Sequence, residues 1–174
     1  TKTLELEPVN GIFETNVSFE NIETWHFDSP NLYEMQVDVY DKKDCSDSYF
    51  SRFGFRKIEI KGNQLFLNEE PVRLPGIEYM PGSYPSYGMA EPEQVLSQAV
   101  DLMKNLNCVI TRFHWQQDSR ILDLMDETGI LVQQEIPWWQ SPRNLSEAQE
   151  NLAKQHIDAM IERDYNRPSI FSWG

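Results

Sequence analysis

The sequence of 174 residues predicts a multidomain fold, in which part of a β-sandwich precedes a region of alternating strands and helices. Over residues 1–53, apolar and polar side chains alternate as they do in antiparallel strands with one buried face. From residue 74 onward, apolar patterns with helical spacing separate short runs of β-branched and aromatic residues. Strands that alternate with helices over short links pair in parallel.

The region 1–53 has its clearest strand at Tyr33 to Val39, where every second residue is apolar. Trp25 is expected in the core of the sandwich. Because an immunoglobulin-like sandwich needs roughly 100 residues, we expect its first strands to be missing here. Further short strands are predicted around Leu4, Leu6, Val17 and Phe19. Turns or loops are indicated at Asn10-Gly11, Ser29-Pro30 and the polar run 41–48.

Residues 54–74 predict two hairpins that seal the junction between two domains. Alternating strands cover Ile58 to Ile60 and Leu65 to Leu67, and turn residues occupy 61–63 and 68–71. We therefore divide the chain into the C-terminal part of an immunoglobulin-like β-sandwich, 1–53, and a second domain, 54–174.

After the hairpins, the second domain continues with a strand at 74–78 and a loop at 79–90 that is rich in Gly, Pro, Ser and Tyr. A helix follows, with Pro92 in its first turn and its end at Asn107. Its apolar stripe consists of Val95, Leu96, Ala99, Val100, Leu102, Met103 and Leu106.

The central strand–helix–strand unit covers Cys108 to Trp139. The strand at 108–113 leads into a helix that Asp118 caps, and Gly129 takes the left-handed turn after the last helical residue. A second strand then runs from Leu131 to Ile136.

A third helix starts near Ser146, whose spacing to Gln149 fits a capping box, and it ends around Asn166, before Pro168. A fourth strand begins at Ile170. A closed (β/α)8 barrel needs about 250 residues, roughly twice what this domain supplies, and half a barrel leaves two sheet edges unpaired. The sequence therefore predicts the N-terminal half of a (β/α)8 TIM barrel, and we expect the chain to be a piece of a longer protein. The residues of the third helix expected to face the sheet are Leu152, Ile157, Met160 and Ile161.

Charged and aromatic residues follow both strands of the central unit. Because ligands bind at the carboxyl ends of parallel strands, this rim is a candidate site. A structural ion pair is the alternative role for Arg112 and Glu135, and core packing is the alternative for each tryptophan. The rim residues are Arg112, His114 and Trp115 after the first strand, and Glu135, Trp138 and Trp139 after the second.

Composition excludes several classes of function. A net charge of −13 opposes binding to nucleic acid or to an anionic membrane surface, and no apolar run is long enough to cross a bilayer. Two cysteines support no disulfide framework. Three histidines far apart in the sequence give no metal-ligand spacing, so we expect no metal and no cofactor. No signal peptide is visible and the first residue is not Met, so cytoplasmic, periplasmic and secreted locations all stay open. The sequence also leaves the oligomeric state open.

Four segments in order resemble family 2 glycoside hydrolases, the group of β-galactosidases, β-glucuronidases and β-mannosidases. They are TWHFDSPNLYEMQV, FGFRKIEIKGNQLFLNEEPVRLPG, TRFHWQQDSRILDLMDETGILVQQEIPWW and ERDYNRPSIFSWG. The resemblance implies an immunoglobulin-like domain before a catalytic (β/α)8 barrel. It also implies retaining hydrolysis of a β-glycosidic bond by two carboxylates.

The resemblance places neither catalytic carboxylate in this chain. It puts the acid/base Glu in an Asn-Glu pair just after Gly174, and the nucleophile at the end of the seventh barrel strand. Arg112 would hold and ionise the nucleophile, His114 would bind a sugar hydroxyl, and Glu135 would accept from a hydroxyl or pair with Arg112. Trp115, Trp138, Trp139 and Trp173 would form a stacking floor for a sugar ring, with Trp173 the best candidate.

Three departures from the family pattern stand out. Arg112 and His114 are two residues apart, where the family has Arg-x-x-His. The segment IPWWQSP lacks the acidic residue and the His of the metal-binding β-galactosidases, so their magnesium site is not expected. Met80 stands near the position of the family's His after the first strand.

Within the family, a β-galactosidase is our first choice, with β-glucuronidase and β-mannosidase as alternatives. An alternative from a different class of function is a non-catalytic homologue that binds carbohydrate. A metal-dependent barrel hydrolase is a weaker rival, because the His-x-His strand signal of such enzymes is absent. The partners expected are a carbohydrate substrate and the remainder of the parent polypeptide.

Overall fold

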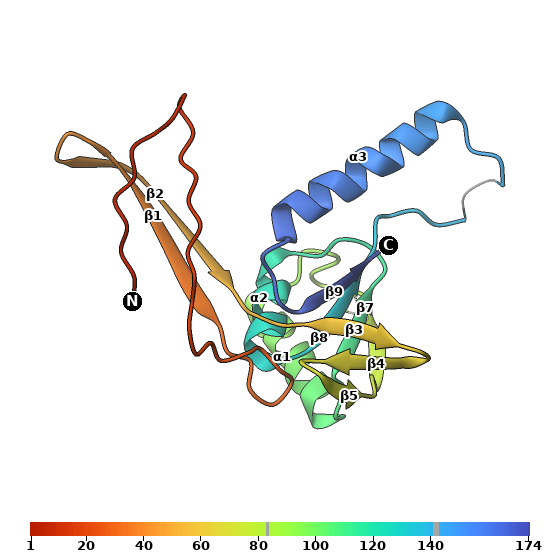
Figure 1. The fold of residues 1–174 in the computed structure, drawn as a ribbon. Coiled ribbons are helices and arrows are strands. Elements are labelled where there is room, and N and C mark those ends of the chain that lie inside the picture. The colour runs from red at the N-terminus through yellow and green to blue at the C-terminus, as the bar shows by residue number, and fades with distance from the viewer. Residues whose placement is uncertain (83, 141–142) are drawn as a thin grey trace.

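The computed structural model of this protein describes residues 1–82, 84–140 and 143–174. This part of the chain contains three separate sheets, of two, three and four strands. Figure 1 shows the two-stranded sheet as a ribbon that extends away from the rest, and the four-stranded sheet beside helices α1 and α2. The predicted fold class, part of a sandwich before half of a barrel, is confirmed.

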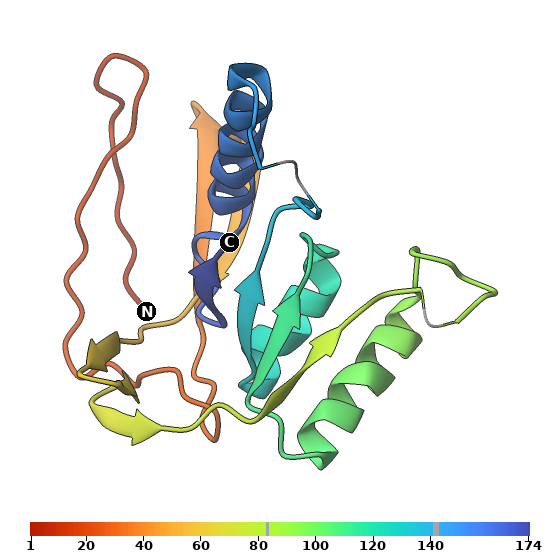
Figure 2. The ribbon, with the colours of Figure 1, turned by 90° about the vertical axis from the view of Figure 1, so that its right-hand side faces the viewer.

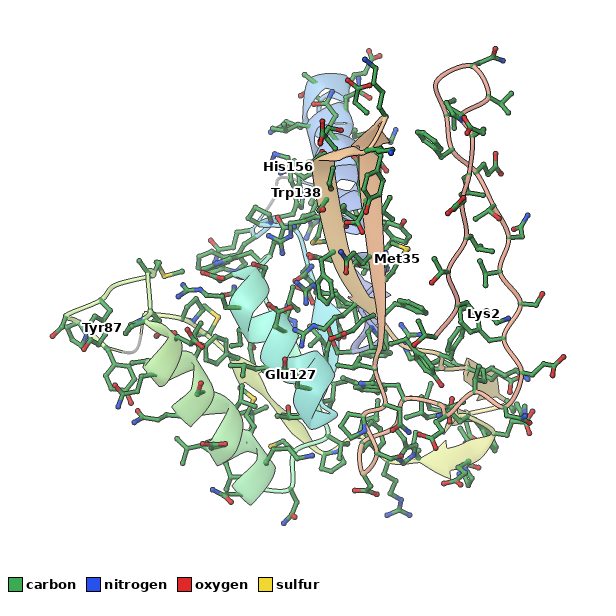
Figure 3. All side chains as sticks on the ribbon, turned by 90° about the vertical axis from the view of Figure 1, so that its left-hand side faces the viewer. Lys2, Met35, Tyr87, Glu127, Trp138 and His156 are labelled. Carbon is green, nitrogen blue, oxygen red and sulfur yellow. The ribbon has the colours of Figure 1, made fainter. Side chains whose placement is uncertain are left out.

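The two-stranded sheet is an antiparallel hairpin of β1 (Tyr33–Asp41) and β2 (Asp44–Phe53). The turn predicted within 41–48 is confirmed but is shorter than that range, because Asp41 pairs with Asp44 and only Lys42 and Lys43 form the turn. Hairpin pairing thus extends strand structure into a polar sequence. The apolar side chains of β1 remain partly open to solvent, as Figure 3 shows for Met35.

Residues 1–32 form no strand ladder, so the strands predicted around Leu4, Leu6, Val17 and Phe19 are wrong. Their backbone is extended, but a strand exists only where a neighbour accepts its hydrogen bonds. The Asn10-Gly11 turn is confirmed, with positive φ angles of 54° and 78° at its two residues. On either side, Val9 and Ile12 exchange backbone hydrogen bonds of 2.8 and 3.0 Å.

The junction contains the two predicted hairpins, built from β3 (Ile58–Lys61), β4 (Gln64–Leu67) and β5 (Glu70–Val72). They cover a core cluster of Trp25, Phe27, Leu67 and Leu131. Trp25 is fully buried there, and its Nε1 donates to the carbonyl oxygen of Asp126 at 2.7 Å. Its predicted place in the sandwich core is therefore wrong, since its partners belong to the hairpins and the barrel.

The four-stranded sheet is the expected half barrel. Its strands β6 (Gly76–Tyr79), β7 (Ile110–Phe113), β8 (Leu131–Gln134) and β9 (Ile170–Trp173) follow the chain order and are all parallel. Figure 2 shows these arrows pointing the same way, with the junction hairpins near the end where the strands begin.

Helices α1 (Glu93–Asn105) and α2 (Ser119–Thr128) bury their apolar stripes against the sheet. Pro92 is the N-cap of α1 and not a helical residue, and α1 ends two residues before the predicted Asn107. In α2 the predicted caps are confirmed: Asp118 accepts from the backbone N–H of Arg120, and Gly129 adopts a left-handed φ of 74°. Of the predicted α1 stripe, Leu102 and Leu106 are exposed.

Helix α3 (Glu147–Asp164) has the predicted capping box of Ser146 and Gln149. Of its predicted contact face, Met160 is buried and Ile157 and Ile161 are half-buried, but the prediction for Leu152 is wrong. Leu152 is 46% exposed, and the buried residues of the helix are Met160 and Asp164 near its C-terminal end. In Figure 1 the rest of α3 projects away from the sheet. Only its last turns reach an element of the described chain.

An ionic cluster with two buried carboxylates, Asp126 and Asp164, fixes the approach to β9. The Arg167 guanidinium donates to Asp123 at 2.7 Å, to Asp126 at 3.1 Å and to Asp164 at 3.2 Å. Asp126 also accepts from the backbone N–H of Ser169 at 3.0 Å. Burial raises the pKa of Asp126, and the hydrogen bonds from Ser169 and the charge of Arg167 oppose that rise.

The Arg56 guanidinium completes the anchorage of β9 from the other side. It donates to the carbonyl oxygens of Pro168 and Ile170. A side chain from the N-terminal part of the chain therefore satisfies backbone groups at the start of the last barrel strand, and leaving such carbonyls unpaired would be costly.

We predict that Gly129→Ala destabilises the full-length protein more than Gly62→Ala. Both glycines have positive φ, which costs alanine about 1–2 kcal/mol. A Cβ at Gly129 would lie 2.3 Å from the carbonyl oxygen of Phe27, whereas nothing lies within 4 Å at Gly62. Urea denaturation should show about 1–3 kcal/mol of extra loss for Gly129→Ala. Equal losses in the two variants would contradict the contact with Phe27.

Candidate active site

Three charged side chains meet at the carboxyl ends of β6, β7 and β8. The Arg112 guanidinium donates from Nε and Nη2 to the two oxygens of Glu135, at 2.6 and 2.7 Å. Its Nη1 lies 3.2 Å from Oε1 of Glu78. Such a bidentate arginine–carboxylate pair is strong and fixes the orientation of both planes.

Parallel pairing explains why these residues meet. Arg112 is in register with Glu78 on β6 and with Gln133 on β8, so the three side chains share one face of the sheet. Glu135 follows two residues after Gln133, and its backbone N–H donates to the carbonyl oxygen of Phe113 at 3.1 Å. Gln133 Nε2 donates to Glu135 Oε1 at 2.6 Å.

The Arg112 hydrogen bonds lower the pKa of Glu135, with further lowering from Gln133 and from the charges of Arg112 and His114. Burial opposes this shift, since the Glu135 side chain is only 16% exposed. Arg112, in turn, has a raised pKa because Glu135 accepts its hydrogen bonds. The pair is therefore charged throughout the neutral range.

Aromatic rings lie beside this charged group. The imidazole of His114 is 5.6 Å from the ring of Trp115 and 6.3 Å from that of Trp139, which it meets nearly edge-on at 78°. Trp139 is 69% exposed, and Trp138 is half-buried. Figure 3 shows Trp138 and His156 at the end of the molecule from which α3 projects.

Trp115 also lines a shallow cavity of ≈ 290 Å³ between the loops after β7 and β8 and helix α3. Most of its wall is apolar. The residues around it are Trp115, Gln116, Ile136, Pro137, His156, Ala159 and Met160.

Trp173 is not brought into the group of Glu78, Arg112, Gln133 and Glu135, which is called the Arg112 group from here on. It is in register with Gln134, whose side chain is fully buried, and its ring packs against the core cluster between the sheet and the helices. The backbone beyond it does reach the rim. Gly174 donates to the carbonyl oxygen of Gln134 at 3.0 Å, and its own carbonyl accepts from Ile136 at 2.8 Å. A Cβ at Gly174 would lie 3.0 Å from Cγ of Glu135.

Glu78 and Gln133 belong to the group but were not among the predicted residues. A signal for Glu78 was present, because it stands near the end of the predicted strand at 74–78, where rim residues are expected. Gln133 lies within a strand, and only the register shows that it supports Glu135.

Over the described ranges, which omit 83 and 141–142, no three His, Cys, Asp or Glu side chains are grouped so that they could hold a metal ion. Ser141 and Pro142 of the segment IPWWQSP lie outside the described residues. None of the described helices is both long and apolar enough to span a membrane.

Relatives with similar sequences and structures are known. A β-galactosidase of Thermoanaerobacterium thermosulfurigenes is 36% identical over 97% of this chain and 24% of its own length. A β-glucuronidase structure from Parabacteroides merdae, with glycerol in its active site, has a TM-score of 0.86 and 29% identity over 94% of this chain and 20% of its own. A β-galacturonidase from Eisenbergiella tayi, bound to galacturonate, has a TM-score of 0.82 and 29% identity over 94% of this chain and 30% of its own.

The chain thus spans about a quarter of the length of its β-galactosidase relative. Two sequence models match it: "Glycosyl hydrolases family 2" over residues 1–56, and "Glycosyl hydrolases family 2, TIM barrel domain" over residues 58–174. Because these matches cover nearly every residue, the chain belongs to glycosyl hydrolase family 2.

Proposed function

We propose that the full-length protein is a retaining β-glycosidase that removes terminal β-linked sugars, and that this chain supplies one side of its active-site rim. In this reaction one carboxylate attacks the anomeric carbon while a second protonates the leaving oxygen, and water then releases the sugar. The observation that carries the proposal is the Arg112 group at the carboxyl ends of three parallel strands, in a chain of this family.

In this proposal Arg112 holds the nucleophilic carboxylate and keeps it ionised. Glu135 orients the guanidinium and Gln133 holds Glu135, and the second N–H of Nη1 and of Nη2 remains beyond the contacts with Glu78 and Glu135. His114 binds a sugar hydroxyl. Both reacting carboxylates come from other parts of the protein, with the acid/base Glu just after Gly174. That position is supported by the backbone of Gly174, which lies beside Glu135.

The tryptophans of the site would contact the sugar in two different ways. Trp115, Trp138 and Trp139 are open enough to stack on a sugar ring. For Trp173 we propose a contact through one ring edge only, because its ring packs against the core cluster.

We also propose that the sandwich part covers 1–53, the barrel part covers 54–174, and the remainder of the polypeptide packs on both. Exposed apolar side chains on β1 and α3, and the outer edges of β6 and β9, support such a packing.

The preferred substrate is a β-galactoside, because the relatives that are 36% identical are named β-galactosidases. A β-glucuronide is the second candidate, favoured by the similarity to the Parabacteroides merdae structure. A non-catalytic carbohydrate-binding protein would share the rim but lack the Asn-Glu pair, so the sequence that follows Gly174 in the parent distinguishes it.

We predict that the full-length protein hydrolyses one of the nitrophenyl glycosides β-galactoside, β-glucuronide and β-mannoside. Arg112→Ala should reduce its kcat about 100- to 1,000-fold, since a preorganised charged donor is lost from the site. Steady-state kinetics of the wild type and of Arg112→Ala would measure both the turnover and its loss. Glu70→Gln, at an exposed position on β5 in the junction hairpins, is the control and should keep full activity. Absence of turnover with all three glycosides would favour a binding protein.

The chain of residues 1–174 alone should hydrolyse none of these glycosides, because neither reacting carboxylate is proposed to lie in it. Overnight incubation with each nitrophenyl glycoside at high protein concentration would test this. If the purified chain hydrolyses a glycoside and its Arg112→Ala variant does so equally well, the activity comes from a contaminant. If the substitution abolishes the activity, the proposal that both reacting carboxylates lie outside this chain is refuted.

The Arg112–Glu135 pair should make stability depend on pH. Arg112 lowers the pKa of Glu135 below its usual 4.5, so the stabilisation is complete above that pH and disappears as the pH falls through the lowered pKa. The free energy of unfolding of the wild type should therefore exceed that of Glu135→Gln at pH 7, with the gap closing in acid. Urea denaturation of the full-length protein from neutral to acidic pH measures it. A gap that is independent of pH would contradict the ion pair.

A further inference from the structure

The Arg112 guanidinium contacts two carboxylates, Glu135 and Glu78. Glu135 already occupies Nε and Nη2 with two short hydrogen bonds, and its side chain is the most covered of the three. Glu78 adds a second carboxylate at 3.2 Å from Nη1, and its side chain is 39% exposed, as open as that of Arg112. One positive charge thus faces two negative charges.

Among the described residues, Arg112 is the only cation within ion-pair distance of Glu78 or Glu135. His114 is the other titratable side chain whose charge acts on Glu135. Glu78, Arg112 and Glu135 together carry one more negative charge than positive charge. Because the Glu78 side chain is as exposed as that of Arg112, this excess negative charge is open to an approaching ligand.

We propose that Glu78 is a specificity-determining residue that makes the site prefer a neutral sugar to a sugar that carries a carboxylate. The proposal rests on the proposed glycosidase function and names the substrate class of that site. A sugar hydroxyl can donate a hydrogen bond to the Glu78 carboxylate. A uronate would instead place its carboxylate against Glu78 and compete with it for Nη1 of Arg112, and like charges brought together in this way discriminate between ligands.

A merely structural role for Glu78 makes a different prediction. If it only held Arg112 in place, its removal would disturb Arg112 in the same way for every substrate. The ratio between a neutral substrate and a charged one would then stay constant. Selectivity by charge changes that ratio and also depends on salt, because exposed charges are screened.

The test compares nitrophenyl β-galactoside with nitrophenyl β-galacturonide, using the full-length protein. The two substrates share the leaving group and the ring configuration. They differ only at carbon 6, which is a hydroxymethyl group in the galactoside and a carboxylate in the galacturonide. For Glu78→Gln, the ratio of kcat/KM for the galacturonide to that for the galactoside should rise about tenfold over wild type at low salt, because two like charges near a protein surface repel by about 1–4 kcal/mol and 1.4 kcal/mol is tenfold. In wild type the ratio should rise with added salt, and in the variant it should change less.

Glu70→Gln is the matched control, because it removes one exposed carboxylate far from the rim, and it should leave the ratio unchanged. Equal losses for both substrates in Glu78→Gln, with an unchanged ratio, would overturn the proposal and leave Glu78 as a support of Arg112.

A binding measurement separates failure of this proposal from failure of the proposed function. If the protein hydrolyses no glycoside, quenching of tryptophan fluorescence by galactose and by galacturonate gives two dissociation constants. Weaker binding of galacturonate, with a difference that narrows in Glu78→Gln, would support charge selection even though the glycosidase function had failed. Equal dissociation constants in wild type, or no binding of either sugar, would overturn it.

Discussion

Parallel pairing of four strands is the constraint on which the rest of this structure depends. Two strands can run in parallel only if the chain crosses back between them, and here three helices make that crossing. The same pairing brings every strand end to one edge of the sheet, where side chains from separate segments meet. Glu78, Arg112 and Glu135 are therefore neighbours because of the topology, although they are far apart in the sequence.

The two ends of the sheet are held by different chemistry. Where β9 begins, Asp126 and Asp164 are buried and pair with Arg167, and the Trp25 cluster packs beside them through the hydrogen bond from Trp25 to the Asp126 carbonyl oxygen. At the opposite end, Arg112 and its carboxylates remain partly open. Charges in the first region serve to fix a strand, whereas charges in the second can exchange partners with a ligand.

The parts of the fold that sequence could predict are those decided by neighbours along the chain. The caps at Asp118, Gly129 and Ser146 and the turn at Asn10-Gly11 depend on local backbone geometry, and all four are found as predicted. The parallel sheet followed from the alternation of strand and helix patterns. Within the candidate site, Arg112, His114, Glu135 and Trp115 could be placed at strand ends by the same reasoning.

What sequence could not show depends on distant partners. Leu4 and Val17 have strand-forming neighbours but no ladder in which to pair, and Leu152 has a helical stripe but no element against it. The side toward which Trp173 points depends on its register with β8, which shifts near Val132. Gln133 became visible as a support of Glu135 only once the register of β7 and β8 was known.

The packing of Trp25 and Phe27 limits where a truncated form of this protein can begin. Both precede the predicted boundary at residue 53, yet they bury against Leu131 and the end of α2, and Phe27 closes over Gly129. A barrel excised at residue 54 would lose these rings and expose an apolar hollow of their size. The boundary in sequence is therefore not a boundary in packing, and a fragment that keeps the packing of the barrel part has to start upstream of Trp25.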